Sequence, residues 1–301
     1  MVPGWGTMVP PERCRTGAGR GFFRHKAQEI QSGCGAAIPN GAGSVPAQYV
    51  LGGMAPDGGV MSGEPQFIGI DESFTFACGA QKGCFNQCCC DLNQFLYPYD
   101  ILRLSRALKM STREFLDAYT FIYTGDSTGL PVVSFKTSTR EHNACPFVTD
   151  KGCAVYDDRP ASCRFFPLAR ALARSREDGS ITEYFAVIED PICEGFIGGE
   201  VWTPRRWMES QGLVAYNKHN DRMMELISLK QQHMPGRLEG DDRKAFELAC
   251  YDLDGFRGQV ADGTISLDAD RKQAVLDDDE ALLGEAMGWI RERLFGTRRA
   301  S

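Results

Sequence analysis

Apolar residues recur at helical spacing after Pro98, a residue that favours the first turn of a helix. The pattern predicts a helix over PYDILRLSRALK (98–109). Ser111 and Glu114 have the spacing of a capping box, in which each side chain satisfies a backbone amide of the other residue. We therefore expect a second helix through REFLDAYTFI (113–122), directly after the first.

Runs of β-branched and aromatic residues bounded by turn residues predict two strands, at LPVVSFK (130–136) and EYFAVIED (183–190). Further along, Thr203 and Pro204 supply an N-cap and a first-turn proline. Apolar residues then follow at helical spacing to about Gln232. This pattern predicts one long helix.

The pair Gln211-Gly212 interrupts this helix and predicts a bend there. The acidic remainder of the chain predicts helices at 241–252, 268–281 and 282–294. The run Asp277 to Glu280 has neither the spacing nor the glycine of an EF-hand, so we interpret it as a solvated face. Together the elements predict an α+β fold: a small cysteine-cluster core of irregular loops, short strands and packed helices, followed by a helical C-terminal part.

Glycine and proline are concentrated near the N-terminus, where the first 65 residues hold 14 of the 33 glycines and 7 of the 15 prolines. Such a segment buries too little apolar surface to offset the entropy of ordering it. We predict disorder for residues 1–66, a folded domain at 67–235 that contains most of the cysteines, and an acidic helical region at 236–301. A mis-assigned start, with translation beginning at Met54 or Met61, is the alternative explanation of the extension.

The 301 residues carry a formal net charge of -7, which argues against a general affinity for nucleic acid or an anionic membrane. No apolar run reaches the length of about 18 residues that spans a bilayer. The first residues, MVPGWGTMVPPERCR, lack the apolar stretch of a secretory signal. We therefore expect a cytoplasmic protein that binds neither nucleic acid nor membrane.

Cysteine is the unusual component, with 12 residues in a chain that we expect in a reducing compartment. Clustered thiols in such a compartment are more often metal ligands or redox groups than disulfides. Nine of the 12 cysteines lie between Cys78 and Cys193. CGAQKGCFNQCCC (78–90) forms a first group, ACPFVTDKGCAVYDDRPASCRFFP (144–167) forms a second, and Cys193 is an outlier.

A soft or borderline cation needs about four thiolate or imidazole ligands at about 2.3 Å, and loops with closely spaced cysteines provide them. The adjacent Cys88 and Cys89 reach one ion only if the backbone turns sharply; otherwise the pair serves two sites. Eight cysteines could fill two four-coordinate sites or one larger cluster: Cys78, Cys84, Cys88, Cys89, Cys145, Cys153, Cys163 and Cys193. Their spacings are those of neither a zinc ribbon nor a bacterial ferredoxin, so spacing does not identify the metal.

Several motifs occur in a specific order: FACGAQKGCFNQCCC (76–90), LYPYDILRLSRAL (96–108), CPF (145–147) and GCAVYDDRPASCRFFP (152–167). Over about residues 74–196, this order resembles the YkgJ-type cysteine-cluster family, the zinc- or iron-chelating CxxCxxCC domain. The resemblance implies a cytoplasmic bacterial metal-binding protein whose cofactor is zinc or iron, with an iron–sulfur cluster as one form of the iron site.

The family motif maps onto Cys78, Cys84, Cys88 and Cys89, and its later motifs map onto Cys145, Cys153 and Cys163. Five residues separate the first two of these cysteines and three separate the next two, which departs from the family's simplest spacing. The altered loop makes Cys78 the least secure of the mapped ligands.

Three functions fit these observations. The first is a redox-active iron–sulfur centre that serves a partner enzyme. The second is an interaction module in which zinc is purely structural and contributes folding free energy. The third is a metal-dependent enzyme, because the family's relatives include a flagellin lysine methylase group. The only partner that the sequence identifies is the metal ion; a protein partner stays open and unidentified.

Other polar residues have simpler interpretations. Arg159 and Arg164 flank the last cysteine of the second group and either compensate the charge of a thiolate site or serve as a turn cap and a solvated side chain. Asp100 fits the first turn of its helix, where a carboxylate complements the helix dipole. Cys250 is isolated in a helical stretch and is expected to be a small buried hydrophobe. His219 is expected to face solvent on the long helix.

Overall fold

The structure is a computed structural model that describes residues 50–51, 66–90, 94–137, 143–174 and 181–296. The chain divides into two compact units that interleave along the sequence. Unit 1 comprises Met1–Gln94, Thr137–Tyr156 and Ala161–Val214, and unit 2 comprises Phe95–Lys136, Asp157–Pro160 and Ala215–Ser301. Neither unit ends at residue 66 or 235, and the domain limits drawn from the sequence stay a prediction.

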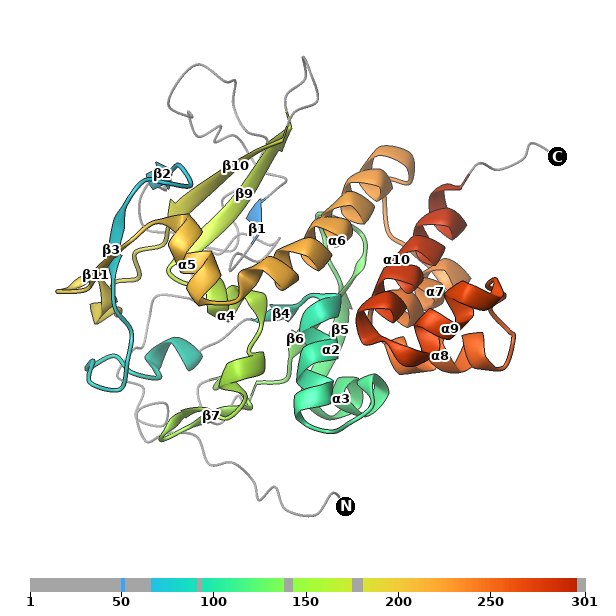
Figure 1. The fold of residues 1–301 in the computed structure, drawn as a ribbon, viewed down its shortest axis with the longest axis horizontal. Coiled ribbons are helices and arrows are strands. Elements are labelled where there is room, and N and C mark those ends of the chain that lie inside the picture. The colour runs from blue at the N-terminus through green and yellow to red at the C-terminus, as the bar shows by residue number, and fades with distance from the viewer. Residues whose placement is uncertain (1–49, 52–65, 91–93, 138–142, 175–180, 297–301) are drawn as a thin grey trace. The chain divides into compact units, whose positions relative to one another are not determined.

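Short antiparallel strands form the framework of unit 1 (Figure 1). The strands are β1 (Val50–Leu51), β2 (Gln66–Ile68), β3 (Phe74–Phe76), β7 (Val148–Thr149), β8 (Gly152–Cys153), β9 (Leu168–Arg174), β10 (Ile181–Val187) and β11 (Glu200–Trp202). The largest sheet has the order β1-β9-β10-β2, while β3 pairs with β11 and β7 pairs with β8. The described helices of this unit are α4 (Ala161–Phe165), α5 (Pro204–Ser210) and the 3-10 turns η1 (Gln87–Cys89) and η4 (Glu194–Phe196).

An aromatic cluster around Phe76 forms the core of unit 1. Phe76 is 1% exposed, and its ring lies edge-on to those of Phe196 and Trp207, with centroid distances of 5.2 and 5.6 Å. A Cβ atom at Gly195 would lie 2.3 Å from the Phe76 ring, so the chain passes this ring only because position 195 is glycine. Burial of these large rings supplies much of the hydrophobic stabilisation of the unit.

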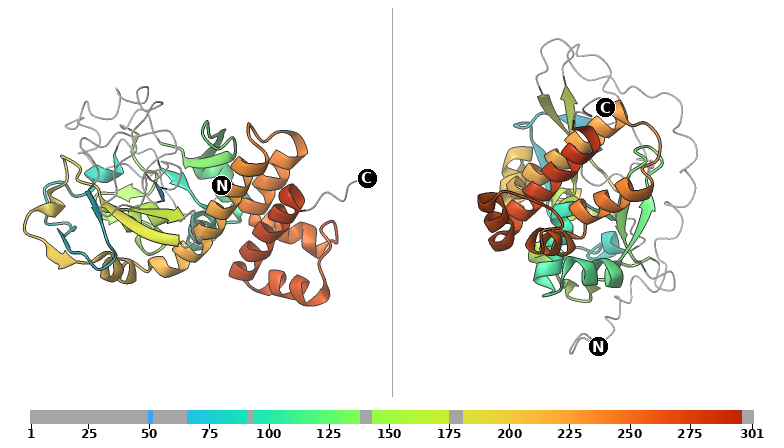
Figure 2. Two further views of the ribbon diagram at one scale, coloured as in Figure 1. Left: turned by 90° about the horizontal axis from the view of Figure 1, so that it is seen from above. Right: turned by 90° about the vertical axis from the view of Figure 1, so that its right-hand side faces the viewer.

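Unit 2 is mostly helical, with one three-stranded sheet in the order β4-β6-β5. Its strands are β4 (Phe95–Leu96), β5 (Thr120–Thr124) and β6 (Pro131–Phe135). Its helices are α2 (Pro98–Ala107), α3 (Thr112–Tyr119), α6 (Leu213–His233), α7 (Gly240–Cys250), α8 (Leu253–Ala261), α9 (Ala269–Asp277) and α10 (Asp279–Phe295). The first two residues of α6 belong to unit 1 and the rest to unit 2. The C-terminal helices α7, α8, α9 and α10, coloured orange to red, lie side by side in both views of Figure 2. Their buried residues include Phe246, Phe256 and Leu283.

An ion-pair network ties α2, α8 and α10 together within unit 2. Arg106 lies 2.7 Å from Asp254 and 2.8 Å from Asp279, and Asp279 also binds Arg257. The hydrogen bond from Arg106 lowers the pKa of Asp279 to about 2, with a further contribution from Arg257. The interpretation of Asp277 to Glu280 as a solvated face is therefore wrong for Asp279, because tertiary partners bind this carboxylate.

The α+β prediction is confirmed, and several element boundaries follow the local signals. α2 begins at Pro98, and α3 begins at Thr112 after the capping box of Ser111. The long helix predicted after Thr203 is interrupted at Gly212, which has φ +63° and separates α5 from α6. A left-handed residue of this kind ends a helix at little cost only when it is glycine.

Two stretches differ from the prediction. The helix expected over 113–122 ends at Tyr119, and 120–124 pair with β6 instead. These β-branched and aromatic residues satisfy their backbone groups in the sheet, which outweighs the helical spacing. The C-terminal region contains α8, which the sequence pattern did not reveal, in addition to helices close to the three predicted ones.

The predicted N-terminal disorder lies almost wholly outside the described residues. Within that stretch the structure describes Val50–Leu51, which pair with β9, and Gln66, which belongs to β2. Among the helices that the structure describes, none combines the length and apolar character needed to cross a membrane.

Candidate metal centre

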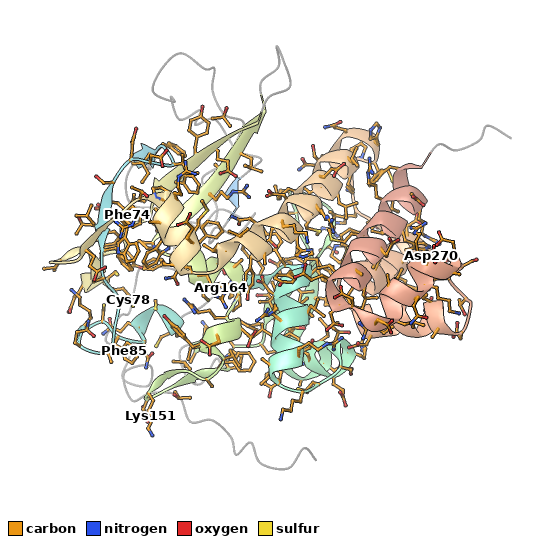
Figure 3. All side chains as sticks on the ribbon, viewed as in Figure 1. Phe74, Cys78, Phe85, Lys151, Arg164 and Asp270 are labelled. Atoms are coloured by element: carbon orange, nitrogen blue, oxygen red, sulfur yellow. The ribbon has the colours of Figure 1, made fainter. Side chains whose placement is uncertain are left out.

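All eight predicted ligands lie in unit 1, mostly on loops and turns between its short strands, and none of the eight is disulfide-bonded. Cys78 follows β3, and Figure 3 shows it on the same stretch of chain as Phe85. The adjacent Cys88 and Cys89 lie in the 3-10 turn η1. Cys84 lies in the turn that precedes η1. The other four are Cys145 before β7, Cys153 in β8, Cys163 in α4 and Cys193 before η4. Cys90, by contrast, is disulfide-bonded and is not a candidate thiol ligand.

A series of tight turns carries the first cysteine group. The amide of Phe85 donates to the carbonyl of Lys82 at 3.1 Å, and the amide of Gln87 donates to the carbonyl of Cys84 at 2.9 Å. Asn86 adopts a left-handed conformation with φ 69°, a region that asparagine enters more readily than most residues. The turns reverse the chain repeatedly, so that cysteines a few residues apart come within reach of common neighbours.

The first group meets the Cys193 loop through backbone hydrogen bonds to sulfur. The amide of Glu194 donates to Cys84 Sγ at 3.3 Å, and the amide of Gly195 donates to Cys193 Sγ at 3.4 Å. The carboxylate of Glu194 in turn accepts from the amide of Gly83 at 2.7 Å. Burial raises the pKa of Cys193 to about 11, and the nearby thiols of Cys84 and Cys78 raise it further.

Cys145 is the centre of a second group. Its amide donates to the carbonyl of Cys89 at 2.8 Å, and the backbone amides of Phe147 and Val148 interact with its sulfur. Burial raises the pKa of Cys145 to about 12 despite these amides, and Cys153 and Cys88 add to the increase. Val148 lies opposite Cys153 in the β7–β8 pair, which brings this second sulfur to the same hairpin.

Cys88 and Cys89 lie in a sharp turn, η1. Adjacent cysteines need such a turn if both are to reach one ion. The thiols of Cys88 and Cys89 are hydrogen-bonded to each other, which lowers the pKa of Cys88 and raises that of Cys89 well above its usual range. Cys145 and Cys163 are near enough to raise the pKa of Cys89 further. Cys88 and Cys89 therefore lie where the two groups of thiols adjoin.

The sulfurs are neighbours but do not yet form a complete ligand set. Within the part of the chain that the structure describes, no three cysteine, histidine, aspartate or glutamate side chains converge on one ion position. Thiolate donors with backbone amides directed at them are chemically suited to zinc or iron. The residues present thus fit such a metal in donor chemistry.

Comparison with known proteins agrees with this assignment. Residues 77–194 match the model of the CxxCxxCC family, whose description is "Putative zinc- or iron-chelating domain". Residues 77–194 match a CxxCxxCC domain. This match confirms the family resemblance and the general assignment of metal chelation. No curated protein and no solved structure matches the chain.

The CxxCxxCC domain contains all eight predicted ligands, because they extend from Cys78 to Cys193. It also includes the segments of unit 2 that carry α2, α3 and the β4-β6-β5 sheet. The cysteines themselves belong to unit 1 alone.

Of the other polar residues considered from sequence, Arg164 and His219 are buried rather than solvated. Arg164 is 8% exposed and donates to the carbonyl of Gln211 at 2.7 Å, which ties α4 to the end of α5. His219 is 2% exposed and stacks on Tyr99 with ring centroids 4.5 Å apart. The prediction of a solvent-facing His219 is wrong, because α6 is covered by α2 on this side.

The simpler interpretations of Asp100 and Cys250 are confirmed. Asp100 accepts from the amide of Tyr97 at 2.9 Å and caps α2. Cys250 is 0% exposed in α7, and burial raises the pKa of its thiol far above the usual value. Arg159 lies in the short segment assigned to unit 2.

Sequence reasoning missed Glu194 and Gly195 as part of the CxxCxxCC site. Both act on sulfur through the backbone, and Glu194 also receives the amide of Gly83. Their position directly after Cys193 was the available signal, since amides that follow a cysteine can reach its sulfur. Gln94 was missed as well, and its Oε1 lies 3.9 Å from Cys163 Sγ.

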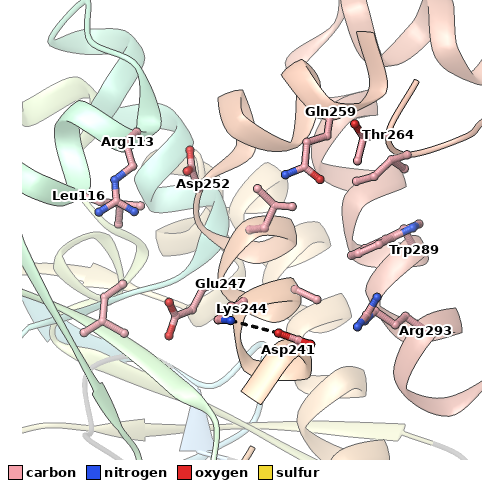
Figure 4. A pocket seen from close by; sticks show the side chains of 14 residues that line it. Arg113, Leu116, Asp241, Lys244, Glu247, Asp252, Gln259, Thr264, Trp289 and Arg293 are labelled. Atoms are coloured by element: carbon pink, nitrogen blue, oxygen red, sulfur yellow. Dashed lines mark hydrogen bonds and ion pairs between the residues drawn. The ribbon is translucent and has the colours of Figure 1, made fainter. Parts of the chain in front are cut away.

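A groove of about 590 Å³ in unit 2 has a different character from the CxxCxxCC site (Figure 4). No cysteine lines it, and its charged groups are paired locally: Lys244 lies 3.1 Å from Asp241. Arg293 lies over the Trp289 ring at 5.7 Å and also contacts Asp242 at 3.3 Å. The groove therefore offers no set of soft donors for zinc or iron.

Proposed function

We propose that the eight cysteines of unit 1 bind zinc or iron as thiolates, and that the protein is a cytoplasmic metal chelator. The observation that carries the proposal is the direction of backbone amides toward sulfur, at 3.3 Å for Cys84 and 3.4 Å for Cys193. Cys145 interacts with two further amides. Amide donors stabilise negative charge on sulfur, and loops that aim them at several clustered cysteines are suited to metal thiolates.

The charge of a metal–thiolate site is consistent with its surroundings here, which favours metal chelation over a set of isolated reactive thiols. Four thiolates around a divalent ion leave a net charge near −2, which needs nearby donors when water is partly excluded. The backbone amides of Glu194 and Gly195 supply such donors without adding a side-chain charge.

Zinc and iron need the same kind of ligand from these loops. Both bind thiolate sulfur, and an iron–sulfur cluster is also held by four cysteines. A cytoplasmic location belongs to the proposal because the eight ligand cysteines, unlike the disulfide-bonded Cys90, must stay reduced to bind metal.

The test is metal analysis with an ultraviolet–visible spectrum of the full chain purified without oxygen. We expect stoichiometric zinc without colour, or iron and sulfide with broad absorbance near about 400 nm, as thiolate-bound iron–sulfur clusters show. Cys145→Ser should lower the metal content, whereas Cys250→Ser, which alters a thiol remote from the cluster, should leave it unchanged. A chain that binds neither metal would overturn the proposal.

A further inference from the structure

We propose that His219 is a pH-sensitive switch in unit 2: the neutral ring holds the start of α10 against α6 and α2, and protonation of the ring loosens this contact. The groups involved all belong to unit 2. The eight cysteines belong to unit 1, so the inference does not depend on the proposed metal site.

The ring of His219 lies in an enclosed aromatic contact. Tyr99 of α2 stacks on it, with ring centroids 4.5 Å apart and ring planes 19° apart. Tyr216, three residues earlier on α6, lies edge-on to Tyr99 at 5.0 Å. All three side chains are almost completely buried. A neutral imidazole gains packing energy in this place, whereas a charged one must give up nearly all of its hydration.

The two ring nitrogens of His219 have different surroundings. Nε2 lies 3.4 Å from Oε2 of Glu280, the second residue of α10, whereas Nδ1 is buried and has no hydrogen-bond partner among the described residues. A neutral ring with its proton on Nε2 donates to Glu280 and leaves Nδ1 as a bare acceptor. Protonation places a second N–H at Nδ1, where no described residue accepts it. An unpaired buried donor costs free energy, so this geometry disfavours the charged ring.

The carboxylate of Glu280 favours the charged ring, but it is partly hydrated and shared. Its side chain is 45% exposed, and it also binds Lys218 Nζ at 3.1 Å. Water screens a carboxylate at this exposure, and the ammonium group of Lys218 offsets part of its charge. Glu280 therefore compensates only part of the cost of a positive charge on His219.

Cations of α6 and α2 lie on the other sides of the contact. Lys218 and Arg222 of α6 both make a positive charge on His219 less favourable. On α2, Arg103 is hydrogen-bonded to the stacked tyrosine, and its Nε donates to Asp158 at 2.8 Å. The Asp158 carboxylate is thus already bound to a cation. The charges around the ring accordingly add to the preference for its neutral form.

The pKa of His219 follows from this balance. Burial is the largest cause and lowers the pKa, the contact with Glu280 raises it in part, and Arg222 and Lys218 lower it further. A group whose pKa is lower in the folded state takes up a proton more readily when the contact opens. The stabilisation by His219 is therefore complete above about pH 6.5, the pKa of an exposed histidine, and declines as the pH falls below that value.

The start of α10 is the part of the fold that this contact holds. Next to it, Arg222 Nη1 lies 2.9 Å from where a Cβ atom at Gly284 would be, so α6 and α10 approach closely at a glycine. Asp279 is bound to Arg106 and has a pKa of about 2, so it stays charged while His219 takes up its proton. Acidification to about pH 5 thus loosens the α6 side of α10 while the ion pairs of Asp279 persist.

The test follows the His219 ring by NMR in the full-length chain and measures hydrogen exchange at the Leu282 amide, which donates to the carbonyl of Asp278 at the start of α10. We expect the ring to titrate below about pH 6.5 and the opening rate, corrected for intrinsic exchange, to rise between about pH 7.5 and 5.5. A ring that titrates above this value, or opening that does not change with pH, would overturn the inference.

Variants separate a switch from a purely structural histidine. His219→Phe keeps a stacking ring that cannot take up a proton, and it should abolish the pH dependence of exchange while α10 stays protected. Glu280→Gln removes the carboxylate that favours the charged ring, so the midpoint should move to lower pH. His233→Gln, at an exposed position of α6, is the control and should keep the midpoint of the unmodified chain. A pH dependence that persists in His219→Phe, or a midpoint unchanged in Glu280→Gln, contradicts the switch.

Discussion

Unit 1 consists of short strands and loops around the Phe76 aromatic cluster, whereas unit 2 packs α7, α8, α9 and α10 around buried aliphatic and aromatic side chains. Cysteine plays opposite roles in the two. In unit 1 the eight predicted ligands are exposed or half-buried, while Cys250 of unit 2 is 0% exposed. The same residue type is therefore a candidate ligand on clustered loops and a small hydrophobe within a helix.

The two units also differ in what their polar groups do. In unit 2, charged side chains pair with each other, as Arg106 does with Asp254 and Asp279. In unit 1, backbone amides are directed at sulfur, as those of Glu194 and Gly195 are. Arg106, Asp254 and Asp279 of unit 2 thus satisfy one another, whereas the amides beside the cysteines of unit 1 are arranged for a negatively charged site that a metal would complete.

Metal removal should separate the two units most clearly. Structural zinc contributes apparent folding free energies on the order of 10 kcal/mol, so a chelator should cost unit 1 most of its stability. Hydrogen exchange should show loss of protection at the amides of Ala77 and Cys145, both bonded within the cysteine loops. Amides of α8 and α10 should keep their protection. Equal loss in both units would show that the metal does not act on unit 1 specifically.

Leu283→Ala should lower the stability of unit 2 without affecting metal binding. Leu283 is 0% exposed in α10, and truncating such a leucine costs about 2–5 kcal/mol through lost burial and the cavity left behind. Denaturant unfolding measures the loss, and metal analysis checks that binding is retained. Val214→Ala, at a position that is 71% exposed, is the control and should change stability by less than about 0.5 kcal/mol. Loss of metal in Leu283→Ala would show that metal binding by unit 1 depends on the stability of unit 2, which contradicts this prediction.

Acid should weaken unit 2 through Asp279. The hydrogen bond from Arg106 lowers the pKa of Asp279 to about 2 from 3.8, so its contribution is present above about pH 4 and is lost as the pH falls toward 2. Because the side chain is 35% exposed, solvent screening limits the effect to about 1–2 kcal/mol. Asp279→Asn should flatten the pH dependence of unfolding between about pH 4 and 2. Asp126→Asn, at an 85% exposed carboxylate, is the control and should leave the pH dependence of unfolding unchanged. If Asp279→Asn also leaves it unchanged, the ion-pair network does not stabilise unit 2 in the way described here.

The smallest effect is expected at the start of α3. Ser111 Oγ accepts from the amide of Glu114 at 3.2 Å, and the Glu114 carboxylate accepts from the Ser111 amide at 2.8 Å. Ser111→Ala removes the N-cap acceptor and should cost about 0.5–1 kcal/mol in denaturant unfolding. Ser111→Thr keeps a hydroxyl acceptor and should lose less. Equal stability of the alanine and threonine variants would contradict the capping role.

Local signals in the sequence predict where many elements start. The Ser111 capping box and Pro98 each mark a helix start that the structure has at that place. The pairing of 120–124 with β6 could not be predicted, because it depends on a strand that becomes a neighbour only on folding. His219 was misjudged for the same reason, since its burial depends on Tyr99 of another helix.

The candidate site was also predictable only in part from the sequence. Cysteine spacing and motif order indicate which side chains belong to it, and the match over 77–194 supports the family. The amides of Glu194 and Gly195 could not be predicted from residue type, because every residue except proline has a backbone N–H. The side-chain chemistry of a site is thus readable from sequence, while its backbone donors require the fold.

The most direct test of the central claim is the X-ray absorption spectrum of the metal in protein purified without oxygen. Thiolate chelation predicts a first shell of four sulfurs at about 2.3 Å from the metal. The Cys250→Ser variant should give the same spectrum, because this thiol is buried in α7 of unit 2. A first shell of nitrogen and oxygen, or protein without metal, would contradict the assignment of the cysteines as ligands.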